Sequence, residues 1–272
     1  MPLGYYDVGA TPFTALQVDQ RVSYCLYVPE NLKADQDRSS VRLIVAMHGT
    51  GRTADAYRDG FAGLAERTRS IVLAPLFPVG LIEPGELSNF KRIKFHDMRF
   101  DLLLLAMVEE VAKKYGLDPL KRFLLFGFSG GGQFAHRFYY LHPDRLAAVT
   151  IGAPGSSTQI DDSRDWWVGT RNFKAEFGSG LDLEAMRKVR VQMIVGALDT
   201  ETWEITIKPG DRIWMEGAND AGRTRIDRLK TLAANYEKNG IPVRLDIVPG
   251  IGHEGWKALD PVIAFFEETL RV

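Results

Sequence analysis

Cysteine is almost absent from this sequence: among 272 residues there is one, Cys25. A single cysteine excludes an internal disulfide, which fits a reducing compartment rather than a disulfide-stapled secreted domain. Long hydrophobic runs are missing too. The longest, at 102–108, is far shorter than the roughly 20 residues of a membrane-spanning helix, and residues 1–15 lack the basic and apolar segments of a secretory signal peptide. These absences predict a cytoplasmic protein with no membrane partner.

The sequence also lacks an excess of charge of either sign. Its formal net charge is -1 and its pI is about 6.5, whereas nucleic-acid binding requires a basic domain or stripe. We therefore expect no nucleic-acid partner. The sharpest basic cluster is Lys91, Arg92 and Lys94, which we interpret as a solvated loop.

Strand and helix patterns alternate along the chain, which favours a mostly parallel central sheet with helices on both faces. We expect strands over 20–29, 41–47, 70–74, 122–128, 146–152, 189–197 and 243–248. We expect helices over 53–68, 97–115, 130–141, 226–239 and 256–270, with Asp97 as an N-cap and Gly116 ending the second helix. The irregular stretch 155–188 is predicted to be an insertion over the active site. Since no linker divides the chain, 1–272 is expected to be one domain.

The strongest local motif is Gly127-Phe128-Ser129-Gly130-Gly131. It fits G-x-S-x-G, and it lies between an apolar strand and a helix pattern, which is the context of a nucleophile elbow. Small residues on each side allow the sharp turn, and helix N-terminal amides can stabilise an oxyanion. We predict that Ser129 is a nucleophile.

A serine hydroxyl needs a base to take its proton. Of the five histidines, His253 alone lies after the last predicted strand and before the last helix. A lone loop histidine is usually a surface residue, but this position favours the general base.

The histidine in turn needs a carboxylate that fixes its tautomer. Asp199 directly follows the strand 189–197, and the chain order Ser129, Asp199, His253 is that of α/β-hydrolases. Alternatively, Asp199 is only a turn residue. Three other aspartates are weaker candidates because none follows a predicted strand: Asp220, Asp227 and Asp246.

The oxyanion donors are expected to be the backbone amides of Thr50 and Gly130. Thr50 lies in His48-Gly49-Thr50-Gly51, directly after the strand 41–47, where a second donor is found in this type of hydrolase. Gly51 is the substitute for Thr50, and His48-Gly49 can also be read as a simple strand-ending turn.

Tryptophan is the basis of a substrate-pocket hypothesis. Trp166 and Trp167 lie in the insertion, and Trp203 is four residues past Asp199. We expect Trp203, with Trp166 or Trp167, to line the acyl or alcohol pocket; the alternative is that these rings only fasten the insertion to the sheet.

Taken together, these residues resemble the α/β-hydrolase superfamily, from about residue 22 to the C-terminus. They look most like its polyhydroxybutyrate-depolymerase-like and feruloyl-esterase-like esterases. The closer likeness rests on segments 48–51, 97–100, 115–119, the elbow and 142–149. The resemblance implies that nucleophile, acid and base fall on Ser129, Asp199 and His253, and the oxyanion donors on Thr50 and Gly130.

The expected function is hydrolysis of a small-molecule carboxylic ester through an acyl-enzyme. A peptidase, amidase or thioesterase of the same fold remains an alternative, because a triad alone does not select the bond. A non-catalytic binding protein is a further alternative, although it would lack the nucleophile or base. No metal or cofactor is expected, since neither metal-ligand spacing nor a P-loop is present. The sequence does not indicate the oligomeric state.

Overall fold

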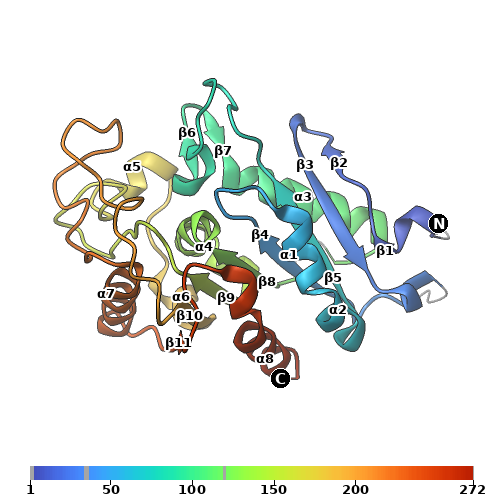
Figure 1. Ribbon diagram of the computed structural model, residues 1–272. Coiled ribbons are helices and arrows are strands. Elements are labelled where there is room, and N and C mark those ends of the chain that lie inside the picture. The colour runs from blue at the N-terminus through green and yellow to red at the C-terminus, as the bar shows by residue number, and fades with distance from the viewer. Residues whose placement is uncertain (1–2, 34–36, 119–120, 272) are drawn as a thin grey trace.

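The computed structural model describes residues 3–33, 37–118 and 121–271. Its centre is a sheet with strand order β1-β3-β5-β4-β8-β9-β10-β11, and β2 pairs with β3 at one side (Figure 1). The strands of this sheet are β1 Gly9–Ala10, β2 Thr14–Leu16, β3 Asp19–Val28, β4 Arg42–Met47, β5 Ser70–Leu76, β8 Phe123–Phe128, β9 Leu146–Gly152, β10 Arg190–Gly196 and β11 Val243–Val248.

Within the sheet, neighbouring strands are parallel from β5 through β4, β8, β9 and β10 to β11, and β3 joins β5 antiparallel. The central strands are buried from end to end, as in β8, where Phe123–Phe128 is wholly apolar apart from one glycine. Continuous apolar runs are typical of parallel strands because helices cover both faces. The predicted fold class, a mostly parallel sheet with helices on both faces, is confirmed.

Two layers of helices cover the sheet (Figure 1). One face carries α1 Ala54–Gly60, α2 Ala62–Thr68 and α8 Leu259–Leu270, where Phe61 stacks on Phe266 and also meets Phe126 of β8. The other carries α3 Phe100–Tyr115, α4 Gly130–Leu141 and α7 Arg225–Lys238, where Tyr139 packs on Tyr236. The short helices α5 Phe173–Phe177 and α6 Leu183–Arg187 follow β9 and precede β10 in the sequence.

Three helix predictions need correction. Asp97 does not cap a helix, because it lies in the turn between two short paired strands, β6 Lys94–Phe95 and β7 Met98–Arg99. The helix α3 therefore begins at Phe100 and ends, as predicted, at Gly116, which has a positive φ of 69°. The span 53–68 is two helices that meet at Phe61, and 256–270 begins with a 3-10 turn, Gly255–Ala258.

The irregular segment after β9 packs against a second irregular segment, 197–224, after β10. Trp167 and Val168 form a small apolar cluster with Ile207 and Ala218, and the indole N–H of Trp167 donates to the carbonyl of Ile213. Figure 1 shows the two segments side by side, away from the N-terminal strands. Within the described ranges, no helix is long and apolar enough to cross a membrane.

Candidate active site

The predicted nucleophile, acid and base meet at the carboxyl edge of the sheet. Ser129 follows β8 directly, Asp199 follows β10, and His253 lies five residues past the end of β11. Parallel strands all end at the same edge, so residues far apart in sequence become neighbours there. Hydrogen bonds fasten the two loops together: the Leu198 amide donates to the Ile251 carbonyl over 2.9 Å.

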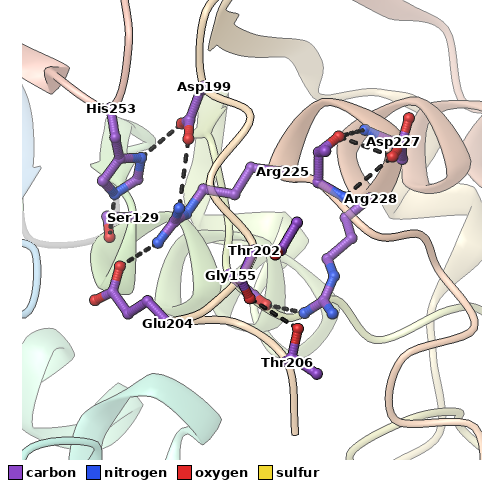
Figure 2. Close-up of polar contacts among 11 residues, drawn as sticks. Ser129, Gly155, Asp199, Thr202, Glu204, Thr206, Arg225, Asp227, Arg228 and His253 are labelled. Carbon is purple, nitrogen blue, oxygen red and sulfur yellow. Dashed lines mark hydrogen bonds and ion pairs between the residues drawn. The ribbon is translucent and has the colours of Figure 1, made fainter.

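These three side chains form a hydrogen-bonded chain (Figure 2). His253 Nδ1 lies 2.6 Å from Asp199 Oδ2, and His253 Nε2 lies 2.9 Å from Ser129 Oγ. An ionised carboxylate only accepts hydrogen bonds, so Nδ1 donates to Asp199, and the neutral ring accepts the serine proton at Nε2. The Asp199 carboxylate is buried, whereas the imidazole is 27% exposed. The arrangement can remove a proton from Ser129.

The backbone at Ser129 is strained. Its φ is 57° and its ψ is -117°, a region that non-glycine residues rarely occupy and that is concentrated at functional sites. The turn is tight enough that a Cβ on Gly127 would lie 2.2 Å from the carbonyl oxygen of Gly131. The glycines of the motif are therefore required by close backbone approach, which turns the serine hydroxyl toward His253.

The backbone amides of Thr50 and Gly130 lie near Ser129, and within the described residues neither donates a hydrogen bond to another backbone carbonyl. Gly130 is the first residue of α4, so its amide is one of those a helix leaves unpaired. A Cβ placed on Gly130 would lie 3.1 Å from the Thr50 nitrogen, so these two residues are neighbours. The Ser129 amide is unavailable because it donates to Gly152. The closeness of Thr50 to Gly130 is the arrangement that the predicted pair of donors requires.

The side chain of His48 stabilises the loop at 48–51 that carries Thr50. Its ring Nδ1 donates to the Gly49 carbonyl over 2.8 Å, and Nε2 accepts from the Phe77 amide over 3.0 Å. The ring is fully buried, which lowers the pKa of His48 to about 3. Because it stays neutral, it can hold both hydrogen bonds and fix the turn that presents Thr50.

A residue that the sequence analysis missed extends the chain of contacts. The buried guanidinium of Arg225 lies 3.4 Å from Asp199 and also pairs with Glu204 (Figure 2). Arg225 is the first residue of α7, after a long irregular segment, so no motif or spacing marks it. Its Nη1 donates to Asp199 Oδ1, the carboxylate oxygen that His253 does not contact.

A cavity of about 240 Å³ opens beside Ser129. Its lining comprises Thr50, Leu87, Ser88, Lys91, Arg92, Ser129, Gln133, Gly155, Ser156, Glu204, Ile205, Ile207, Ile213 and Arg225. The interpretation of the basic cluster as a solvated loop was therefore wrong for two of its three members. Lys91 and Arg92 face the cavity because the short helix Asn89–Arg92 folds over α4; Lys94 is exposed.

The tryptophans do not lie in this lining, in contrast to our expectation. Trp203 is 77% exposed. Trp166 packs on Phe173 and Phe177, and Trp167 is buried in the cluster between the two irregular segments. Of the expected insertion 155–188, its first two residues reach the cavity, and most of the wall comes from 87–92 and 204–213. The physical reason for Trp166 and Trp167 is that their rings pack within and between the two irregular segments, which need an apolar core of their own.

The described part of the chain contains no group of three histidine, cysteine, aspartate or glutamate side chains placed to hold a metal ion.

Known structures resemble this chain over nearly its whole length. A poly(3-hydroxybutyrate) depolymerase from Bordetella parapertussis is 23% identical, with a TM-score of 0.72 over 96% of this chain and 90% of that one. Poly(aspartic acid) hydrolase-1 from Sphingomonas sp. KT-1 is 21% identical, with a TM-score of 0.69 over 92% of both chains. A ferulic acid esterase is 15% identical, with a TM-score of 0.62 over 96% of both.

No protein-family model and no curated protein sequence matches the chain. At these identities the structural likeness concerns the fold. The chain has the α/β-hydrolase fold. Its parallel sheet, the helices on both faces of the sheet and the sharp turn at Ser129 are consistent with this fold.

Proposed function

We propose that this protein is a serine hydrolase that cleaves a carboxylic ester through an acyl-enzyme. The single observation that carries the proposal is the hydrogen-bonded chain Ser129–His253–Asp199, with distances of 2.9 and 2.6 Å, beside a cavity that Ser129 lines. A non-catalytic protein would have no need to keep a strained serine backbone aligned with a base and a buried acid.

In the proposed mechanism Ser129 Oγ attacks the ester carbonyl while His253 Nε2 takes its proton. Asp199 holds the ring in the required tautomer and stabilises the imidazolium. The amides of Thr50 and Gly130 donate to the tetrahedral oxyanion. His253 then returns the proton to the leaving alcohol, and a water molecule, activated by the same histidine, hydrolyses the acyl-enzyme.

Ester cleavage is preferred to amide cleavage on the names of two similar structures, a depolymerase of poly(3-hydroxybutyrate) and a ferulic acid esterase. Amide cleavage is the second candidate, because another neighbour is named as a hydrolase of poly(aspartic acid). Rates on 4-nitrophenyl acetate and on the matched 4-nitroacetanilide separate the two: we expect the ester to react and the anilide to remain.

The roles are tested with Ser129→Ala and a pair of aspartate variants. Ser129→Ala should abolish fluorophosphonate labelling and lower kcat by up to about a millionfold, as for triad nucleophiles elsewhere. Asp199→Asn should cost about ten-thousandfold. Its matched control is Asp220→Asn, because Asp220 is exposed and pairs with Arg164. Retention of more than a few per cent of activity by Ser129→Ala, or equal losses for the two aspartates, would contradict the assignment.

A further inference from the structure

The cavity beside Ser129 contains two cationic side chains that form no ion pair within the described residues. Lys91 and Arg92 both line it, and within the described residues no ion pair or side-chain hydrogen bond joins the Lys91 ammonium or the Arg92 guanidinium. Both side chains are half-buried. Charges that leave bulk water are ordinarily paired, because the charged form loses hydration.

The other charges of the lining offset one another. Arg225 is paired with Glu204, and its remaining contact is to the buried Asp199. Arg225 offsets one of these two carboxylates, so the formal charge around the cavity, counting Lys91 and Arg92, is positive by about one, and the unpaired cations are Lys91 and Arg92.

Contacts with other elements hold the backbone of Lys91 and the side chain of Arg92. The buried Arg137 donates to the Lys91 carbonyl over 2.8 Å, so the backbone of the short helix Asn89–Arg92 is fixed on α4. Arg52 donates to Asn89 Oδ1 on the other side. The Arg92 guanidinium lies over the Trp167 ring, 5.8 Å from its centroid. This support distinguishes the pair from flexible surface lysines.

The position of Lys91 relates the charge to the reacting centre. Its Cε lies 3.1 Å from where a Cβ on Gly130 would stand, and the same point is 3.1 Å from the Thr50 nitrogen. The Lys91 Cε therefore lies no more than about 6.2 Å from the Thr50 nitrogen, one of the two amides proposed to hold the oxyanion. A substrate whose carbonyl lies there would place its adjoining groups against Lys91 and Arg92.

We propose that Lys91 and Arg92 bind a carboxylate carried by the substrate, so that this enzyme prefers esters with a negative charge a short aliphatic spacer away from the scissile carbonyl. The inference rests on the proposed ester hydrolysis. The isoleucines at 205, 207 and 213 supply an apolar wall for the spacer. The charge belongs to the acyl part, as in a half-ester of a dicarboxylic acid, or to the alcohol part.

Two matched substrate pairs test the proposal. For the acyl part we would compare 4-nitrophenyl hydrogen adipate with 4-nitrophenyl methyl adipate. For the alcohol part we would compare 4-acetoxybutanoate with methyl 4-acetoxybutanoate. Non-enzymatic rates are subtracted. Because a hydrogen bond to a charged group contributes about tenfold to hundredfold, we expect the anionic member of one pair to have a kcat/KM higher by that factor.

The variants Lys91→Met and Arg92→Met should each lower this anionic-to-neutral ratio by about tenfold. The matched control is Lys94→Met, in the same loop, whose exposed ammonium pairs with Glu176; it should leave the ratio unchanged. Glu204→Gln should raise the ratio, since it frees the positive charge of Arg225.

Protonation supplies an independent readout. The pKa of Lys91 is lowered to about 8, first by burial and then by the charges of Arg92, Arg52 and Arg225, while Glu204 opposes them. The ammonium loses its proton above this pH, so the anionic-to-neutral ratio should fall as pH rises through about 8. In Lys91→Arg the side chain stays charged, and the ratio should stay high at pH 9.

The outcomes separate the two levels of the proposal. Hydrolysis of the neutral esters that Ser129→Ala abolishes supports the serine mechanism whatever the ratios are. Anionic-to-neutral ratios near one in both pairs would refute the carboxylate site. An equal loss on both members of each pair in Lys91→Met would also refute it, because Lys91 would then act on the oxyanion rather than on the substrate's charge. If no neutral or anionic ester is cleaved at all, the proposed function itself fails.

Discussion

Gly196 offers a sharp test of how the active-site loops are held together. It is the last residue of β10, and the loop that carries His253 crosses it closely. In Gly196→Ala the new Cβ would lie 2.2 Å from the Ile251 carbonyl oxygen and 2.4 Å from that of Gly252. Ordinary contact begins at 3.4 Å, so the 251–252 backbone must move by about 1.2 Å.

This displacement is adjacent to His253, whose Nε2 lies 2.9 Å from Ser129 Oγ. Transmitted in full, the shift lengthens that contact to about 4 Å, beyond hydrogen-bond range. A misplacement of about 1 Å costs around a hundredfold in rate, and overpacking costs about 1–3 kcal/mol of unfolding free energy. We therefore expect kcat/KM on 4-nitrophenyl acetate to fall about a hundredfold.

The assay measures kcat/KM and the fluorophosphonate labelling rate, both normalised to the folded fraction from circular dichroism, so that unfolding is not mistaken for misalignment. Gly180→Ala is the matched control, since a Cβ there meets nothing within 4 Å. A folded Gly196→Ala protein with nearly unchanged kcat/KM would refute the reasoning, because the loop would then tolerate the displacement without moving His253.

Three further outcomes follow from the site. Burial lowers the pKa of His48 from 6.5 to about 3. Below pH 6.5 the unfolded chain therefore binds a proton that the folded protein does not bind, and the folded state loses stability as the pH falls. Between pH 7 and pH 5 the free energy of unfolding, measured in urea, should drop by about 2 kcal/mol more in the unchanged protein than in His48→Gln. Arg225→Met should lower kcat/KM about tenfold, the value of one charged hydrogen bond, and its effect should be smaller in a Glu204→Gln background because the two side chains touch. Since the cavity is only about 240 Å³, 4-nitrophenyl butyrate should react faster than the decanoate; the reverse order, with equal solubility controlled by detergent, would contradict the cavity as the acyl site.

The sequence alone was informative where a motif lies between regular elements that are themselves predictable. The elbow lies between a strand and a helix, and both of these elements were expected nearly to the residue: 122–128 against Phe123–Phe128, and 130–141 against Gly130–Leu141. The roles of Ser129, Asp199 and His253 came from their position after predicted strands. This works because parallel strands end at one edge, so strand order in the sequence limits which loops can meet.

The position of a residue after a strand does not fix its side-chain contacts. Only the tertiary structure decided these contacts. The hydrogen bonds of His253 to Ser129 and Asp199 depend on where Gly196 lets the last loop cross β10. The residues that line the cavity could not be predicted from sequence patterns. Of the tryptophans that seemed suited to a pocket, Trp166 and Trp167 pack in or against a small core between two irregular segments, and Trp203 is exposed.

Lys91 and Arg92, by contrast, have the sequence character of a solvated loop. They line the same cavity as Ser129 because Arg137, far along the chain, holds the Lys91 backbone over α4. Periodicity reports burial only within regular helices and strands. In the segments 87–92 and 204–213, which form most of the cavity wall, the direction of a side chain depends on contacts with distant residues. The sequence therefore determined which side chains we propose as the reacting groups, and the fold determined what lies beside them.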